Sequence, residues 1–126
     1  MRTRSRIAVI DDDGSFCEAL VSLLQSFDYD TVGFASADRF LAAGRPETFD
    51  CVVTDIHLPG RSGVELKLAL AERGNDVPVI MVTARTEPHL HSRALACGAA
   101  RLLRKPFAPN ELVETIRDCL GNRPGG

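Results

Sequence analysis

The sequence has little of what a nucleic-acid-binding or membrane protein needs. It contains no tryptophan and one tyrosine, which argues against an aromatic surface for stacking single-stranded bases. Its 17 acidic residues outnumber its 15 basic ones, and a net charge of -2 gives no general attraction to nucleic acid or anionic lipid. The apolar run at residues 7–10 follows three arginines but is too short for a signal peptide or a membrane helix. We therefore expect no direct binding to nucleic acid or membrane.

Cysteine pairs of the kind that bind metals or form disulfides are also absent. There is no Cys-x-x-Cys motif, and no histidine stands at metal-ligand spacing from a cysteine. Each cysteine lies in an apolar stretch, and a chain of 126 residues can build a core without disulfides. We interpret all four as reduced core residues of a cytoplasmic protein. They are Cys17, Cys51, Cys97 and Cys119.

The chain does have the composition of one soluble domain, with 44% hydrophobic and 25% charged residues. Its length predicts a single domain, which we place at residues 6–120. Residues 1–5 would then form an N-terminal arm, and residues 121–126 a flexible tail or truncated linker.

Five short apolar runs alternate with five longer amphipathic stretches. Several runs consist of consecutive apolar, β-branched residues, as expected for strands that are covered on both faces. Five strand-then-helix units predict an α/β fold with a doubly wound parallel sheet and right-handed crossovers. The predicted strands are residues 7–10, 31–34, 51–54, 79–82 and 101–103.

Helix-capping signals stand among the amphipathic stretches. Two Ser-x-x-Glu segments have the spacing of a capping box. Pro88 suits the first position of a helix, and Gly98 suits the residue just past its end. The apolar spacing further predicts a short helix at 37–43 and a last helix at about 110–120. The two predicted capping boxes are Ser15 with Glu18 and Ser62 with Glu65.

Polar side chains stand where the apolar runs end. Asp11 and Asp12 follow the first run, Asp55 follows the third, Thr83 the fourth, and Lys105 comes just after the fifth. Because ligands bind outside the carboxyl ends of parallel strands, we expect these side chains to meet at one edge of the sheet.

Three carboxylates within a few Å would raise at least one pKa unless a cation joined them. Oxygen ligands with room for water suit Mg²⁺, so Asp11, Asp12 and Asp55 are its candidate ligands. With Mg²⁺ and Lys105 the charges sum to zero, which suits a transferring phosphoryl group to which Thr83 donates a hydrogen bond. Asp55 is the predicted nucleophile, because its strand is central and a tight Leu-Pro-Gly loop follows it. The expected product is an aspartyl phosphate.

These residues stand in motifs that resemble the receiver domain of two-component response regulators over about residues 6–120. The resemblance implies a flavodoxin-like, three-layer sandwich with strand order 2-1-3-4-5. The pattern is similar to receivers that often precede a helix-turn-helix output domain. The motifs are V-I-D-D-D ending at Asp13, V-T-D-I-H-L-P-G from Val53, Gly63, V-I-M-V-T-A from Val79 and R-K-P-F from Arg104.

The resemblance also implies roles for the acidic residues. Asp55 matches the phosphoacceptor, and Asp12 and Asp55 match direct Mg²⁺ ligands. Asp11 matches an acid that reaches the metal through water. The backbone carbonyl of His57 matches the remaining protein ligand.

Thr83 matches the switch hydroxyl that turns toward the phosphoryl group, and Lys105 matches the lysine of the family's site. The Lys105–Pro106 bond stands where receivers commonly have a cis peptide. One position departs from the family, because the residue three before the lysine is usually Tyr or Phe and here is Leu102. Leucine has no hydroxyl and a smaller volume, so the usual aromatic swing lacks its side chain.

The resemblance implies a sensor histidine kinase, or a phosphotransfer protein, as the partner that delivers the phosphoryl group to Asp55. The fourth helix, fifth strand and fifth helix would then change their surface. We expect a switch that assists its own phosphorylation and dephosphorylation rather than a turnover enzyme. A homodimer that forms on phosphorylation is compatible with this role. The kinase, the stimulus and the output domain or effector are not identified by the sequence.

A second interpretation is a haloacid-dehalogenase-like phosphatase, because residues 11–15 also match the D-x-D-G-[ST] motif with which such enzymes begin. In that alternative Asp11 is the nucleophile and Asp13 the acid/base, while Thr83 and Lys105 serve as the second and third motif residues. Such an enzyme needs another acidic pair after the lysine, and here the later acids all fall on the last helix. It also leaves Asp55 unexplained. A third reading is a pseudo-receiver that only binds partners, against which the complete set of site residues argues.

Overall fold

The computed structural model describes residues 4–85 and 87–121. Five parallel strands form one sheet in the order β2-β1-β3-β4-β5, which confirms the doubly wound α/β fold and the order 2-1-3-4-5. Each predicted strand is present and is one residue longer than its apolar run. The strands are β1 (Arg6–Ile10), β2 (Asp30–Phe34), β3 (Cys51–Asp55), β4 (Val79–Thr83) and β5 (Arg101–Arg104).

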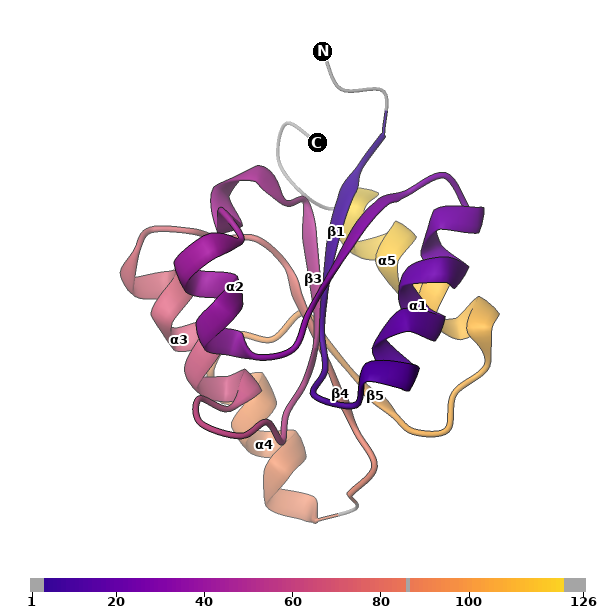
Figure 1. The fold of residues 1–126 in the computed structure, drawn as a ribbon. Helices are drawn as coiled ribbons and strands as arrows, with labels where there is room; N and C mark the ends of the chain where they lie inside the picture. Colours follow the sequence, from indigo (N-terminus) through magenta and orange to yellow (C-terminus); the bar gives the residue numbers. More distant parts are fainter. Residues whose placement is uncertain (1–3, 86, 122–126) are drawn as a thin grey trace.

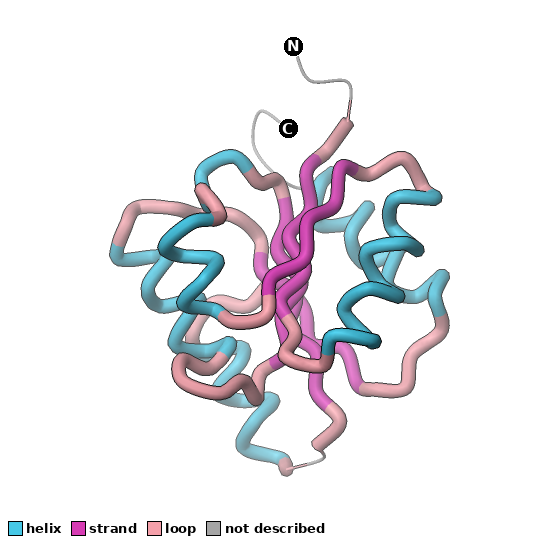
Figure 2. Tube along the Cα trace, viewed as in Figure 1, coloured by secondary structure: helices cyan, strands magenta, loops and turns pink. Residues whose placement is uncertain are grey.

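Helices cover both faces of this sheet. They are α1 (Gly14–Ser26), α2 (Ala37–Ala43), α3 (Gly63–Glu72), α4 (Pro88–Ala96) and α5 (Pro109–Gly121), with a 3-10 turn at η1 (Pro46–Thr48). Helices α2, α3 and α4 lie on one side and α1 and α5 on the other (Figure 1). The sheet, seen edge-on, separates the two helical layers (Figure 2), which is the three-layer sandwich that the resemblance implied.

The hydrophobic core has two halves, one on each face of the sheet. Phe40 and Leu66 are fully buried on the side of α2, α3 and α4, and Leu24 and Ile116 on the side of α1 and α5. Alternate residues of β1 and β3 contribute to the two halves, because successive side chains of a strand point to opposite faces. The central strands are therefore covered on both sides, which explains their continuous apolar runs.

One of the two predicted capping boxes is confirmed. The Ser62 hydroxyl accepts the Glu65 backbone N–H at 3.1 Å, and a carboxylate oxygen of Glu65 accepts the Ser62 N–H at 2.9 Å. The hydrogen bonds from Ser62, its backbone N–H first, hold the pKa of the Glu65 carboxyl below its usual value.

The predicted box at Ser15 was wrong. Helix α1 begins at Gly14, and its N-cap is Asp13, whose carboxylate accepts the Phe16 N–H at 3.2 Å. Aspartate is as good an N-cap as serine, so the helix starts one residue ahead of Ser15 and takes that residue into its first turn.

The other helix boundaries agree closely with the sequence. Helix α2 has the predicted bounds, and α5 begins at Pro109, one residue earlier than expected. Pro88 is the first residue of α4, and Gly98, with a φ of 96°, follows the C-cap Cys97. Such a positive φ is open to glycine without strain.

All four cysteines are free thiols. Cys17, Cys51 and Cys119 are buried as predicted, but Cys97 at the end of α4 is only partly buried. It is the C-cap residue that follows α4, and its thiol donates to the Ala94 carbonyl at 3.2 Å. Burial raises the pKa of the Cys17 and Cys119 thiols, so both are protonated at neutral pH.

Most of the predicted arm, residues 1–5, and of the predicted tail, residues 121–126, lies outside the described residues. Gly121 is the last residue of α5. Within residues 4–85 and 87–121, no helix is both long enough and apolar enough to cross a membrane.

Gly63 brings α3 directly against β3. A Cβ atom at this position would lie 2.6 Å from the Asp55 carbonyl oxygen and 3.1 Å from the Ile56 Cα. We expect Gly63→Ala to lower the free energy of unfolding by about 2 kcal/mol, because the strand backbone would have to move. Gly14→Ala is the matched control, since a Cβ there meets nothing within 4 Å. Urea unfolding of both variants tests this, and equal stability of the two would contradict the close contact.

Candidate functional site

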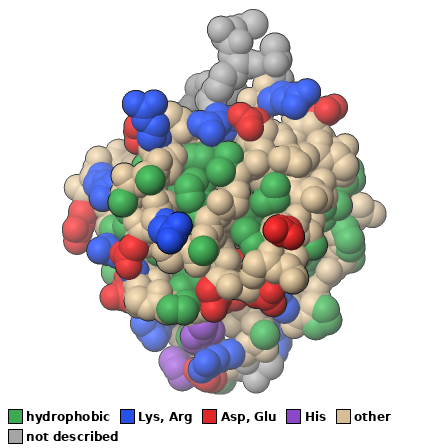
Figure 3. Space-filling view, viewed as in Figure 1, with side chains coloured by type: hydrophobic (Ala, Val, Ile, Leu, Met, Phe, Trp, Pro, Cys, Tyr) green, Lys and Arg blue, Asp and Glu red, His purple; other side chains and the backbone are tan. Residues whose placement is uncertain are grey.

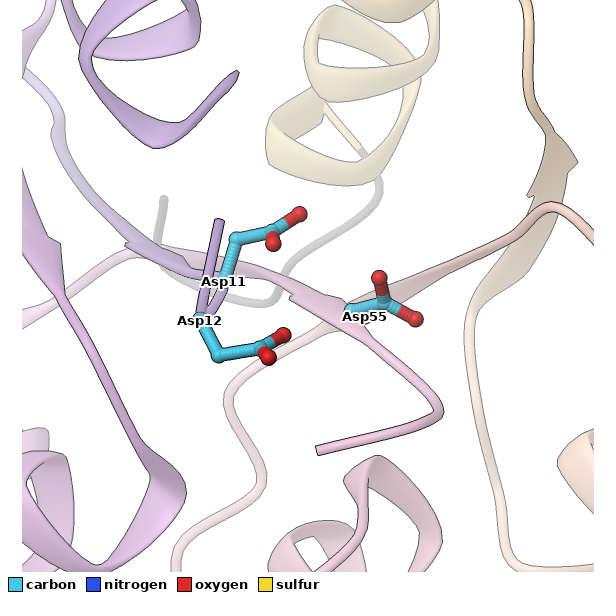
Figure 4. A group of neighbouring side chains, drawn as sticks. All are labelled: Asp11, Asp12 and Asp55. Atoms are coloured by element: carbon cyan, nitrogen blue, oxygen red, sulfur yellow. The ribbon is translucent and has the colours of Figure 1, made fainter. Parts of the chain in front are cut away.

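The carboxyl ends of the strands form an acidic edge. Acidic side chains gather below the centre of the molecule in Figure 3, above the histidines at the bottom, at about the level where β1 and β3 end in Figure 1. Asp11 and Asp12 directly follow β1, and Asp55 is the last residue of the adjacent β3. One carboxylate oxygen of each lies within 4.8 Å of the others, and all three side chains point into the same space (Figure 4). These oxygens are the donor set that Mg²⁺ prefers.

Lys105 joins two of these carboxylates. Its Nζ donates to an oxygen of Asp11 at 3.2 Å and to an oxygen of Asp55 at 3.1 Å. The Lys105 backbone N–H donates to the Thr83 carbonyl at 2.8 Å, which ties the loop after β5 to the end of β4. The peptide bond between Lys105 and Pro106 is cis, as the resemblance implied.

The other oxygens of these two carboxylates accept backbone amides. Asp11, whose side chain is 4% exposed, accepts the Asp13 N–H at 2.9 Å. Asp55 accepts the His57 N–H at 3.0 Å. The buried Asp11 and the partly buried Asp55 are therefore each hydrogen-bonded through both oxygens, whereas Asp12 is exposed to solvent.

Burial has opposite effects on the two kinds of charge in this cluster. Burial raises the pKa of Asp11 and outweighs the Asp13 amide and Lys105, which lower it. Burial lowers the pKa of Lys105, but the hydrogen bonds and charges of Asp55 and Asp11 together raise it above its ordinary value. The lysine is therefore charged at neutral pH, and one ammonium does not offset three carboxylates. This excess negative charge favours a divalent cation at the cluster.

Thr83 lies on the neighbouring strand, one position beyond Val82, which pairs in register with Asp55. The threonine is 1% exposed, and its hydroxyl accepts the Arg85 N–H at 3.0 Å. A cavity of about 260 Å³ lies beside it and is also lined by Leu102. Leu102 therefore borders open space next to the threonine.

His57 adds a partly buried imidazole to the loop after β3. Its Nε2 is buried and has no hydrogen-bond partner among the residues that the structure describes. The ring borders a cavity of about 380 Å³ that Ser62, Arg85 and Arg93 also line. The structure thus shows the His57 amide as an anchor for Asp55, a contact that sequence reasoning missed, and the role of its carbonyl stays a prediction.

The structure therefore brings together four of the six predicted site residues, Asp11, Asp12, Asp55 and Lys105. Thr83 lies on the neighbouring strand β4, and His57 contacts the cluster by donating its backbone N–H to Asp55. Two further contributors were missed. The Asp13 backbone N–H donates to the Asp11 carboxylate. Asp13 is also the N-cap of α1, a role that depends on where the helix begins. The Phe16 ring lies under the Lys105 ammonium, with 4.1 Å between Nζ and the ring centroid.

A doubly wound sheet with a lysine-linked acidic cluster at its carboxyl edge defines a class of phosphoacceptor signalling domains. Comparison with known proteins agrees with this class, since the family model of the response regulator receiver domain matches residues 7–117. The chain belongs to this family, and it is a receiver domain of a two-component system.

Individual relatives support the assignment. The chain is 39% identical over 115 residues to the transcriptional regulatory protein FixJ of Azorhizobium caulinodans, covering 91% of this chain and 54% of that protein. It is 32% identical over 120 residues to the response regulator protein TodT of Pseudomonas putida, covering 95% of this chain and 53% of that protein. The solved structure of chemotaxis protein CheY4 of Vibrio cholerae has a TM-score of 0.86 at 27% identity, covering 94% of this chain and 100% of that one. The chain spans about half the length of the curated relatives it matches.

Proposed function

We propose that this receiver domain accepts a phosphoryl group on Asp55 from the phosphohistidine of a sensor histidine kinase or a phosphotransfer protein. A bond forms between a carboxylate oxygen of Asp55 and phosphorus, and the bond from phosphorus to the donor's imidazole nitrogen breaks. The contact of Lys105 with both Asp55 and Asp11 carries the proposal, because it places a fixed positive charge where phosphoryl oxygens would lie.

Exposure favours Asp55 over Asp11 as the nucleophile. The Asp55 side chain is 14% exposed, against 4% for Asp11, so an incoming donor has better access to Asp55. The His57 amide and Lys105 hold its two oxygens in place, which fixes the carboxylate for attack.

The acidic cluster fits Mg²⁺, with Asp12, Asp55 and the His57 carbonyl as direct protein ligands and Asp11 reaching the cation through water. When bound, the cation supplies two positive charges that offset the phosphoryl oxygens. The three carboxylates, Mg²⁺ and Lys105 then sum to zero charge.

The haloacid-dehalogenase-like alternative has less support. Its acid/base would be Asp13, but this carboxylate caps α1 through the Phe16 amide. Its second acidic pair would come from α5, where Asp118 pairs instead with Arg101 at 3.6 Å, at the beginning of β5 and far from the carboxyl edge. In residues 4–85 and 87–121, the acidic cluster is the single group of three or more candidate metal ligands.

We further propose that the added charge on Asp55 draws the Thr83 hydroxyl away from the Arg85 amide. The cavity shared with Leu102 gives these side chains room to rearrange without an aromatic swing. The surface of α4, β5 and α5 would change as a result and signal to an output domain or effector. The protein would act in the cytoplasm as a switch rather than a turnover enzyme, with residues 6–120 as the folded unit.

The function is tested by incubating the chain with acetyl phosphate and Mg²⁺ and measuring its intact mass. We expect one added phosphoryl group, and reduction with borohydride followed by peptide mapping should place it on Asp55. Modification of Asp11 instead would support the phosphatase. No modification by acetyl phosphate or by any histidine kinase would leave only partner binding and overturn the proposal.

Metal binding gives a separate prediction. Excess Mg²⁺ should stabilise the parent chain, by about 1.4 kcal/mol at ten times the Kd. Asp12→Asn should be roughly 1 kcal/mol more stable than the parent without metal, because one repelling charge is gone, and should gain little from Mg²⁺.

Thermal unfolding with and without Mg²⁺ measures both effects. The control is Asp28→Asn, which removes an exposed carboxylate just before β2, at the other end of the sheet, and should behave like the parent. Equal Mg²⁺ stabilisation of Asp12→Asn and the parent would exclude Asp12 as a ligand.

A further inference from the structure

The Lys105 ammonium has a third neighbour that the proposed chemistry does not use. Besides its bonds to Asp11 and Asp55, its Nζ lies 4.1 Å from the centroid of the Phe16 ring, above the ring face. A cation at this distance from an aromatic face is attracted by the negative charge of the π system.

The Phe16 ring is held from two directions. At the beginning of α1, the Asp13 carboxylate accepts the backbone N–H of Phe16 and so fixes the backbone that carries the ring. Phe107, two residues after the lysine, packs its ring edge-on against it, with centroids 6.2 Å apart and an interplanar angle of 77°. Both rings are partly buried against the core half that α1 and α5 cover. The ring is therefore a fixed surface beneath the ammonium.

We propose that Phe16 is a positioning residue for phosphoryl transfer, holding the Lys105 ammonium in place through a cation–π contact. This inference rests on the proposed function. The hydrogen bond between Lys105 and Asp55 must rearrange when either oxygen of the Asp55 carboxylate becomes bonded to phosphorus. The contact with the ring does not involve the reacting atoms, so it keeps the ammonium at the site throughout the reaction. The ring also keeps water from one side of the charge, which strengthens its attraction for phosphoryl oxygens.

Substitution of Phe16 provides the first test, with the rate of Asp55 phosphorylation by acetyl phosphate at saturating Mg²⁺ as the measurement. Phe16→Leu keeps an apolar side chain but removes the π face, and we expect the rate to fall about threefold to tenfold. Phe16→Tyr keeps the ring and should stay near the parent rate. Phe27→Leu is the matched control, because it makes the same change at the other end of α1, where the side chain is 39% exposed.

Stepwise fluorination of the Phe16 ring separates this role from simple packing. Phenylalanines with one, two and three fluorines keep nearly the same shape while the negative charge of the ring face decreases. The rate should fall with each fluorine, whereas a purely structural ring would give one rate for the whole series.

The outcomes distinguish this inference from the function on which it rests. A flat fluorine series, or a Phe16→Leu rate equal to the parent rate, would overturn the positioning role while Asp55 phosphorylation stands. If the parent chain takes no phosphoryl group on Asp55, the proposed function fails and the positioning role fails with it.

Discussion

Asp55→Asn should take up no phosphoryl group from acetyl phosphate under conditions in which the parent chain takes up one. The amide keeps the shape of the carboxylate but replaces an oxygen nucleophile with a nitrogen whose electron pair is delocalised. It also removes a negative charge from the cluster, so we expect the variant to fold and to be at least as stable as the parent without metal. Intact mass after incubation measures the uptake.

Asp11→Asn is the informative partner of this variant. It should still be modified, but more slowly, because it keeps the nucleophile and loses one carboxylate next to the proposed cation. If Asp55→Asn were still modified and Asp11→Asn were not, Asp11 would be the nucleophile, as the phosphatase alternative requires. That result would overturn the receiver chemistry.

Lys105→Met should slow phosphorylation of Asp55 about a hundredfold or more, the usual cost of removing one preorganised charge from the reacting group. Methionine keeps an unbranched apolar side chain beside Phe16 but cannot donate to phosphoryl oxygens. Because the nucleophile remains, long incubation should still give modified protein, which separates this variant from Asp55→Asn. Time courses of intact mass measure the rate.

The same variant has a predicted pH dependence of stability. Without the ammonium, the buried Asp11 carboxylate loses its partner, and its pKa, already raised by burial, rises further. The stability lost relative to the parent should therefore be greatest above the folded-state pKa of Asp11 and should shrink as the pH falls through that value.

Lys67→Met is the matched control, since it removes the chain's other lysine, from α3. It should leave both the rate and the pH profile close to those of the parent. A rate for Lys105→Met within a few-fold of the control would show that the ammonium does not act on the phosphoryl group.

The sequence predicted most of the acidic edge because the topology of parallel strands determines it. Once β1 and β3 were identified as strands, Asp11 and Asp55 had to lie at the same edge, and the loop after β5 could bring Lys105 there. No side-chain detail was needed for that step. The same reasoning could not place the Thr83 hydroxyl, whose direction depends on the Arg85 amide.

The features that escaped prediction depend on local competition or on packing between distant segments. Asp13 and Ser15 are both good helix caps, and only the backbone geometry decides between them. The Phe16 contact requires the first turn of α1 to meet the loop after β5, and an apolar residue at helical spacing predicts only burial. The partial exposure of Cys97 likewise depends on how far α4 extends over the sheet.

The direct contact of α3 with β3 makes the packing around Asp55 uneven from one side of β3 to the other. The Gly63 N–H donates to the Ile56 carbonyl at 2.9 Å, and no side chain separates this glycine from the Asp55 backbone. A displacement of Asp55 would therefore push on α3 without any soft layer between them. On the other side, Thr83 and Leu102 border a cavity of about 260 Å³, so the packing there is less tight. If the proposed phosphorylation moves residues at the acidic edge, we expect the movement to go into this space, toward α4 and β5, rather than toward the closely packed α3.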